Sequence, residues 1–149
     1  GSVGSRRLMY KQFDKELFAK YDEMGRSIVK DFVKTKEVRA VDNPDKYGID
    51  LLLYKNDRLV GLAEVEVRNS WKGLTFPYED LNVPQRKKKL LDNNILTYFF
   101  SINADGTAMF YCKAKEVLNS ELKESGNKYI ASGEHFYKVP IDKLKYVVL

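Results

Sequence analysis

Three carboxylates, Asp50, Glu64 and Glu66, are the side chains most able to do chemistry in this chain. Asp50 begins one apolar run, and Glu64 and Glu66 lie near the end of the next. Because strand side chains alternate between two faces, Glu64 and Glu66 must share a face. Like charges on neighbouring strands destabilise a sheet, so we expect a positive group beside them. A divalent metal bound by carboxylate oxygens is the natural candidate, and a solvated, salt-bridged strand face is the alternative.

Residues 48–68 are predicted to form the β-hairpin that positions these carboxylates. Two apolar runs flank a polar turn at 55–58. Placing the apolar residues of both runs on one buried face fixes the parity of the strand register and brings Asp50 beside Glu64. A three-residue loop with a bulge is the simplest turn that gives this register. The buried face would then carry Ile49, Leu51, Leu53, Ala63, Val65 and Val67.

The flanking elements follow from the spacing of apolar residues and from turn signals. Apolar residues recur every three or four positions over residues 8–33, which predicts a long amphipathic helix. The nearly continuous apolar run at 95–102 predicts a strand buried on both faces. The other expected elements are a strand at 36–41, an ordered loop at 69–82, a helix at 83–93, a strand at 107–112, a helix at 114–122 closed by a turn at 125–127, and small edge strands at 134–139 and 146–149.

A run of consecutive basic residues follows the hairpin, within the helix expected at 83–93. Its members are Arg86, Lys87, Lys88 and Lys89. Consecutive positions fan around a helix, so one or two of these side chains should point back towards the carboxylates. The run, together with Lys72 and a base-stacking Trp71, is predicted to bind nucleic acid. The alternatives are a solubilising surface run and a Trp71 that anchors the loop.

Composition restricts the class of protein and the other chemistries that are open to it. The 149 residues suit one compact domain over 6–149, and residues 1–5 look like a cloning remnant. One cysteine and one histidine argue against a zinc site, a disulfide framework and a nucleophilic triad, and fit a cytoplasmic protein. We expect Cys112 to be buried and inert, and His135 to lie on an edge strand. No segment reads as a membrane span or a signal peptide, and the net charge of +5 favours an anionic partner.

The order of elements and the spacing of the carboxylates resemble the PD-(D/E)XK nuclease superfamily. Here Gly-Ile-Asp50 precedes Glu64-Val65-Glu66 by the length of a hairpin, and the resemblance covers roughly residues 10–112. It implies an α/β (α+β) fold of the restriction endonuclease type, which is a mixed β-sheet flanked by helices. Asp50 and Glu64 match the residues that bind a catalytic divalent ion in that family.

The last residue of the family motif is normally lysine and is Glu66 in this chain, as in some restriction endonucleases. Arg68 on the same face, or a lysine of the basic run, would supply the missing charge. The family often adds an acidic residue from the first helix, a position that Glu23 matches. The implied ligands of Mg²⁺ or Mn²⁺ are therefore Asp50, Glu64, Glu66 and Glu23.

The resemblance implies a metal-dependent phosphodiesterase, an endonuclease that cleaves DNA in preference to RNA through a metal-activated water. Asp50, Glu64, Glu66 and Arg68 would be its catalytic residues. Two other hypotheses stay open. One is an inactive nuclease-like domain that binds nucleic acid or a protein partner, and the other is an interaction module whose acidic face binds a basic partner. The sequence also leaves open whether the chain is a monomer or a homodimer.

Overall fold

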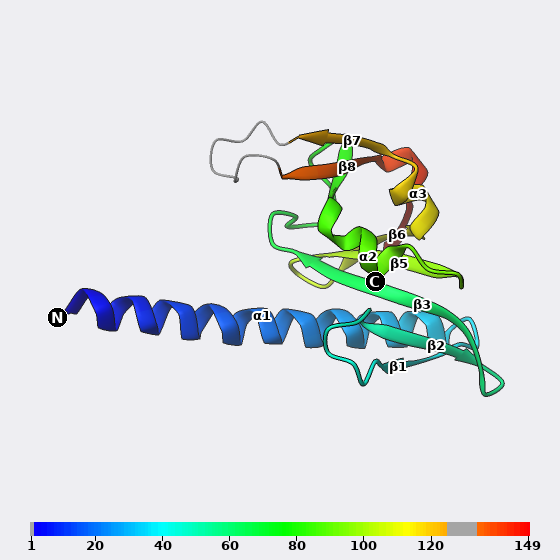
Figure 1. The fold of residues 1–149 in the computed structure, drawn as a ribbon, viewed down its shortest axis with the longest axis horizontal. Coiled ribbons are helices and arrows are strands. Elements are labelled where there is room, and N and C mark those ends of the chain that lie inside the picture. Colours follow the sequence, from blue (N-terminus) through cyan, green and yellow to red (C-terminus); the bar gives the residue numbers. More distant parts are fainter. Residues whose placement is uncertain (1, 125–133) are drawn as a thin grey trace.

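The computed structural model describes residues 2–124 and 134–149 of the chain, with side chains from residue 15 onward. Its elements are α1 Ser2–Lys34, β1 Arg39–Asp42, β2 Leu51–Lys55, β3 Arg58–Arg68, β4 Asp80–Pro84, a 3₁₀ turn at Gln85–Lys87, α2 Lys88–Leu91, β5 Thr97–Asn103, β6 Ala108–Lys113, α3 Ala114–Leu118, β7 Glu121–Glu124, β8 His135–Pro140, a 3₁₀ turn at Ile141–Lys143 and β9 Lys145–Val148. A six-stranded sheet has the order β1-β2-β3-β5-β6-β9, and a smaller sheet has the order β4-β8-β7 (Figure 1). Strands β3 and β5 run parallel, while the other neighbours in the large sheet are antiparallel. The expected class, a mixed sheet with helices packed against it, is confirmed.

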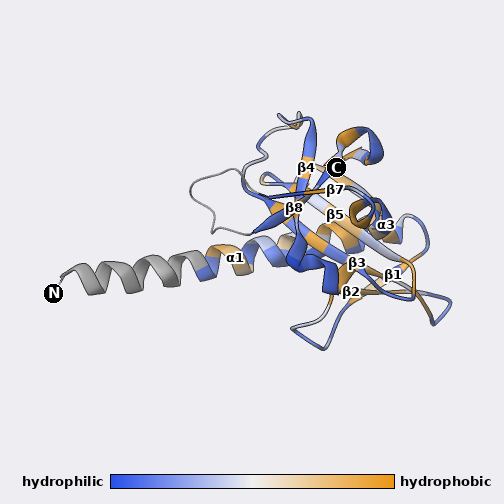
Figure 2. Ribbon diagram, turned by 45° about the horizontal axis from the view of Figure 1, so that its top comes forward, coloured by the Kyte–Doolittle hydropathy of each residue, from blue (hydrophilic) through white to orange (hydrophobic). Residues whose placement is uncertain are grey.

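The large sheet is the middle layer of the molecule. Helix α1 covers one face, where Val29 and Val33 pack against Leu51, Ala63 and Ile102. The small sheet, α2 and α3 cover the opposite face. The buried residues on that side include Leu81, Val83, Leu91, Phe99, Val117 and Val139. In Figure 2 the hydrophobic residues of β5 lie between α1 and the small sheet.

Helix α1 is longer than predicted, and its C-terminal half packs on the sheet. It begins at Ser2 rather than near residue 8, and its first turns project beyond the sheets (Figure 1). The apolar stripe is half-buried at Tyr21, Ile28 and Phe32, whereas Phe18 is 59% exposed. Among the described side chains of α1, the apolar stripe is therefore buried where the sheet lies beneath the helix.

Gly25 lets α1 approach β3 closely. A Cβ atom at this position would lie 3.0 Å from Val67 Cγ2 and 3.1 Å from Val65 Cγ1. Gly25→Val is therefore expected to lower the free energy of unfolding by about 1–3 kcal/mol, because the added atoms must push the helix off the sheet. Urea unfolding followed by circular dichroism measures the loss. Ser27→Val, at an exposed position of the same helix, should change stability by less than about 0.5 kcal/mol. An equal loss in both variants would contradict the close packing at Gly25.

The hairpin forms with the predicted parity of register but with a different turn. Leu51 pairs with Ala63, so the apolar residues of both strands share the α1 face as expected. The turn contains two residues, Asn56 and Asp57, since Lys55 pairs directly with Arg58. Both have positive φ, 49° and 63°, as two-residue hairpin turns require. The extra residue is Val60, which the pairing skips at a bulge within β3. The predicted three-residue loop is therefore wrong.

Residues 80–93 differ most from the prediction. The helix expected at 83–93 is replaced by the end of β4, a 3₁₀ turn and the single turn α2. Strand β4 forms because Leu81 and Val83 alternate towards the core while its backbone pairs with β8. The ordered loop accordingly ends at residue 79 rather than at 82.

The remaining elements follow the predicted order, but β7 was not expected and other elements differ in their bounds. Strands β5, β6 and β9 lie where strands were expected. Helix α3 ends at Leu118, since β7 begins at Glu121. Strand β8 lies between β4 and β7, so a strand expected at an edge is central in the small sheet. The turn expected at 125–127 falls outside the described residues. No helix in the described ranges is long and apolar enough to cross a membrane.

Candidate functional site

The open edge of β3 positions the candidate site. Strand β2 pairs with β3 only as far as Ala63, whereas β3 continues along β5 to its own end. From Glu64 onward, the β2 side of β3 therefore has no strand beside it in the described part of the chain. Asp50 fills this edge, because its Oδ2 accepts a hydrogen bond from the Val65 backbone N–H at 2.8 Å. Asp50 and Glu64 thus meet at the point where the two strands separate.

Lys87 supplies the positive group next to Glu64. Its Nζ donates a hydrogen bond to Glu64 Oε2 at 2.7 Å, and the two side chains are largely shielded, with 18% and 6% of their surface exposed. The other oxygen of the carboxylate, Oε1, is buried and accepts no hydrogen bond from described residues. Lys87 lies in the 3₁₀ turn that follows β4, so the small sheet holds it beside the carboxylate. We call Asp50, Glu64 and Lys87 the edge cluster.

The charges of the edge cluster are strongly coupled. Burial raises the pKa of Glu64 to about 7, the Lys87 ammonium opposes this rise, and the Asp50 carboxylate adds to it through its charge and a hydrogen bond. Burial acts to lower the pKa of Lys87, but the charges of Glu64, Glu66 and Asp50 outweigh it and the pKa is raised. Lys87 is therefore charged at neutral pH, whereas Glu64 gains and loses its proton there.

This raised pKa gives the metal-free protein a defined pH dependence of stability. Folded Glu64 keeps a proton that the unfolded chain, with a carboxyl pKa of 4.5, has released. The free energy of unfolding should therefore fall as pH rises from about 4.5 to about 7, by an amount on the order of 2–3 kcal/mol. Glu64→Gln removes the titration and should flatten this part of the curve.

Urea unfolding in EDTA across that pH range measures the effect. The readout is the difference between wild type and Glu64→Gln, because carboxyls outside the coupled group of Asp22, Asp50 and Glu64 titrate equally in both proteins. Glu23→Gln, at an exposed position, is the control and should follow the wild-type curve. Parallel curves for wild type and Glu64→Gln would contradict the raised pKa.

Helix α1 contributes Asp22 to this edge instead of Glu23. Burial raises the pKa of Asp22, and the charge of Asp50 raises it further. Asp22 and Glu23 are both exposed, and Asp22 lies three positions before the buried Gly25, on the side of the helix that meets β3. The helix carboxylate whose charge interacts with that of Asp50 is thus Asp22, whereas the sequence predicts Glu23 in this role. The spacing from Gly25 is the signal in the sequence that identifies Asp22.

Glu66 and Arg68 belong to a separate hydrogen-bonded group on the same face of β3. Glu66 Oε1 accepts hydrogen bonds from Ser101 Oγ at 2.7 Å and from Arg68 Nη2 at 2.6 Å. Arg68 Nη2 also donates to the Asn82 carbonyl oxygen at 2.6 Å. These bonds tie β3 to β5 and β4. Arg68 is therefore engaged with Glu66, and the charge beside Glu64 comes from the basic run, which was the other option that the sequence offered.

Asp50 and Glu64 are the two carboxylates of the edge cluster that would hold a divalent cation. Both offer hard oxygen donors, and the buried Oε1 of Glu64 has no hydrogen-bond partner among described residues. Of the other predicted ligands, Glu66 is hydrogen-bonded to Arg68 and Ser101, and Glu23 is exposed. No three His, Cys, Asp or Glu side chains among residues 15–124 and 134–149 gather as a metal-binding group. A cation here would take its remaining ligands from water and phosphate oxygens.

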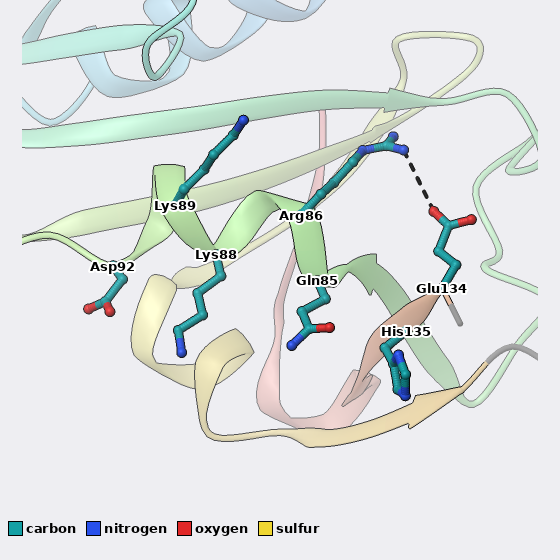
Figure 3. Close-up of a pocket in the computed structure, with 7 residues that line it drawn as sticks. All are labelled: Gln85, Arg86, Lys88, Lys89, Asp92, Glu134 and His135. Carbon is teal, nitrogen blue, oxygen red and sulfur yellow. Dashed lines mark ion pairs between the residues drawn. The ribbon is translucent and has the colours of Figure 1, made fainter. Parts of the chain in front are cut away.

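The rest of the basic run lines an open hollow. Arg86, Lys88 and Lys89 are exposed, and the hollow has a volume of about 650 Å³. Its other lining residues are Gln85, Asp92, Glu134 and His135. In Figure 3, Arg86 and Lys89 extend to one side, whereas Lys88 points to the opposite side. Arg86 Nη1 lies 3.6 Å from Glu134 Oε1 as an ion pair. Lys87 is thus the member of the run that points back towards the carboxylates, as one or two were expected to do.

Trp71, Cys112 and His135 lie in packed positions. Trp71 is fully buried, with its ring 4.8 Å from that of Phe110 in a stacked arrangement, so it cannot stack on a base and that prediction is corrected. Its neighbour Lys72 is exposed. Cys112 is buried as expected, and burial raises the pKa of its thiol to about 12, which removes it as a nucleophile. His135 is half-buried in the central strand of the small sheet rather than on an edge.

No protein-family model, curated protein or solved structure matches the chain. The resemblance to the PD-(D/E)XK nucleases therefore stays a prediction, carried by the order of elements and by Asp50 and Glu64. Two observations at the site itself are consistent with this prediction. The strands separate where these residues lie, and a lysine from a different element reaches Glu64.

Proposed function

We propose that this protein is a metal-dependent phosphodiesterase that cleaves DNA by hydrolysis. The observation that carries the proposal is the edge cluster, in which two carboxylates lie at the open edge of β3 and Lys87 Nζ is 2.7 Å from Glu64 Oε2. Such an arrangement suits metal-assisted phosphodiester hydrolysis, because a cation and a fixed positive charge beside one phosphate both stabilise its developing charge.

In this mechanism Asp50 and Glu64 would hold Mg²⁺ or Mn²⁺. The bound ion would neutralise developing charge on the phosphate and lower the pKa of the attacking water. Lys87 helps to keep Glu64 ionised near neutral pH, because its charge opposes the rise in pKa that burial causes. Its ammonium group can also donate a hydrogen bond to a phosphate oxygen. Lys87 would then take the role that Glu66 cannot fill at the last position of the family motif.

The exposed basic residues close in sequence to Lys87 would hold the substrate. Arg86, Lys88 and Lys89 line the open hollow, and Lys72 is exposed in the loop before β4. Such side chains bind backbone phosphates without reading sequence, and the affinity that they give falls steeply with salt. The net charge of +5 acts in the same direction. DNA is proposed as the substrate before RNA.

Cleavage of plasmid DNA and of labelled oligonucleotides, with Mg²⁺ or Mn²⁺ and with EDTA, tests the proposal. Wild type should cut with either metal and not in EDTA, and Asp50→Ala and Glu64→Ala should both lose cleavage. Glu23→Ala is the matched control, since this carboxylate is exposed and outside the edge cluster, and it should keep activity. RNA oligonucleotides in the same assay decide the substrate. A wild-type protein that cuts neither DNA nor RNA under these conditions would overturn the proposal.

A second candidate is an inactive nuclease-like domain that binds nucleic acid, and one observation favours it. Lys87 neutralises Glu64 in a direct ion pair, as Arg68 does Glu66, so residues of the chain itself compensate two of the carboxylates. Salt-sensitive DNA binding that survives Asp50→Ala and Glu64→Ala, with no cleavage, would select this candidate. Failure to bind nucleic acid at low salt would leave the third hypothesis, a module that binds a basic protein partner.

A further inference from the structure

A second pocket lies on the α1 face of the large sheet. It has a volume of about 580 Å³ and is lined by the C-terminal end of α1, the beginning of β5 and the end of β6, among other segments. This volume is within the range of about 300–1,000 Å³ that is usual for small-ligand sites. Ala63 and Val65 face α1, so Glu64 between them faces the opposite side of the sheet. The pocket and the edge cluster are therefore separate places in the fold.

Aromatic rings form the floor of this pocket. Phe32, Tyr98, Phe100 and Tyr111 line it, and Tyr111 stacks on Phe100 with 5.6 Å between ring centroids and 20° between ring planes. Phe100 is buried, but Phe32, Tyr98 and Tyr111 are only half-buried. The accessible ring surface is of the kind on which a planar base can stack.

Lysines surround these rings. The four that line the pocket, Lys36, Lys113, Lys143 and Lys145, are all exposed. Glu116 is the one acidic residue among the described lining residues. Lys36 Nζ lies 5.4 Å from the centre of the Phe32 ring, and Lys145 Nζ lies 5.9 Å from the centre of the Tyr111 ring. Stacking surface and positive charge thus occur together in one pocket.

We propose that this lysine–aromatic pocket binds a nucleotide, either free or as one unit of a single-stranded nucleic acid. The base stacks on Tyr98 or Tyr111, and the lysines bind the phosphates. Lysine side chains are flexible, so those over Phe32 and Tyr111 can turn to a phosphate when a base takes their place. Phosphate alone gains nothing from the rings, and a carboxylate-rich peptide brings no large planar group, so a nucleotide is the ligand that uses both features.

Binding in EDTA tests this proposal without any metal-dependent cleavage. The full chain is titrated at low salt with ATP, with inorganic triphosphate and with a fluorescent oligothymidylate of about ten nucleotides. ATP or the oligonucleotide should bind more tightly than inorganic triphosphate, which has the charge without the base. Tighter binding of ATP would identify a free nucleotide as the ligand, and tighter binding of the oligonucleotide would identify a single strand. If neither binds, or if triphosphate binds as tightly as both, the proposal is overturned.

Variants locate the binding. Lys143→Gln/Lys145→Gln changes two exposed residues and should weaken binding of the tighter ligand by about tenfold or more. For the oligonucleotide it should also reduce the slope of log affinity against log salt by about 0.7 for each phosphate that the variant no longer binds. Lys20→Gln/Lys46→Gln makes the same charge change at exposed lysines outside the pocket and should leave binding unchanged. If both double variants lost the same affinity, the loss would come from the change in net charge, and the proposal would be overturned.

Two further arms test the rings. Tyr111→Leu should cost about tenfold in affinity, and the exposed lysine pair tests the pocket even if this variant fails to fold. A Lys143→Gln/Lys145→Gln protein that kept the wild-type affinity for the tighter ligand would overturn the proposal. Photocrosslinking to an iodouracil-containing strand should mark Tyr98 or Tyr111. Because none of these readouts uses cleavage, failure of the proposed nuclease activity leaves them interpretable.

Discussion

Lys87→Met is expected to reduce Mg²⁺-dependent DNA cleavage at neutral pH by about 10²- to 10³-fold. The variant removes the fixed positive charge that lies 2.7 Å from Glu64 Oε2. It also removes the interaction that opposes the burial-driven rise in the pKa of Glu64. The carboxyl should then be protonated at neutral pH and lose its ability to bind a cation. Single-turnover rates of oligonucleotide cleavage measure the loss.

Two results would distinguish this role of Lys87 from a general loss of basic charge. Part of the activity should return at alkaline pH in Lys87→Met, because Glu64 then ionises, whereas the wild-type rate should level off above about pH 8. Lys88→Met and Lys89→Met remove the same charge at exposed neighbours and should each lower the rate by less than about tenfold. Equal losses in all three variants would show that Lys87 acts only as one more phosphate-binding residue.

Trp71→Ala is expected to lower the free energy of unfolding by about 3–5 kcal/mol. The side chain is fully buried and packs against Phe110 and Phe76, so its truncation leaves a large cavity. The backbone of Trp71 also fixes the loop, because its N–H donates to the Arg68 carbonyl and its carbonyl accepts from the Ala104 N–H. Urea unfolding is followed by circular dichroism, since the variant lacks the single tryptophan of the chain.

Trp71→Phe is the matched control for this effect. It keeps a ring that can stack on Phe110 and removes the indole Nε1–H, which is buried and has no hydrogen-bond partner among described residues. The loss of stability should therefore stay below about 2 kcal/mol. A loss of that small size in Trp71→Ala would contradict the packing of the loop against the sheet.

The carboxylate hairpin was predictable because its register depends on local alternation. The parity that puts Leu51 opposite Ala63 follows from keeping apolar residues on one face. Its turn could also have been identified, since Asn56 and Asp57 are residue types that tolerate positive φ. The bulge at Val60 has no comparable mark in the sequence. It lies inside an apolar run, where one skipped residue leaves the local composition unchanged.

Strand β4 and the choice of Lys87 depend on contacts between residues distant in the sequence. The strand that pairs with β4 is β8, which lies near the C-terminal end of the described chain. Local propensity contains no information about that pairing. The sequence therefore predicts a helix at 83–93 for the basic run, and it does not identify which lysine of the run reaches Glu64. The different hydrogen-bond partners of Glu66 and Glu64 also depend on contacts between distant residues. Ser101, which binds Glu66, is placed opposite it by the pairing of β3 with β5.

The dependence of β4 on β8 has a consequence for the order in which the site is completed during synthesis. In the described small sheet, β8 is the strand that pairs with β4, and Lys87 follows β4 directly. The hairpin with Asp50 and Glu64 leaves the ribosome well before β8 and can fold first, while the backbone of β4 still lacks its hydrogen-bonding partner. The two carboxylates would stay without their lysine until β8 has been made. A nascent chain would therefore acquire its proposed cutting activity only after both sheets are in place.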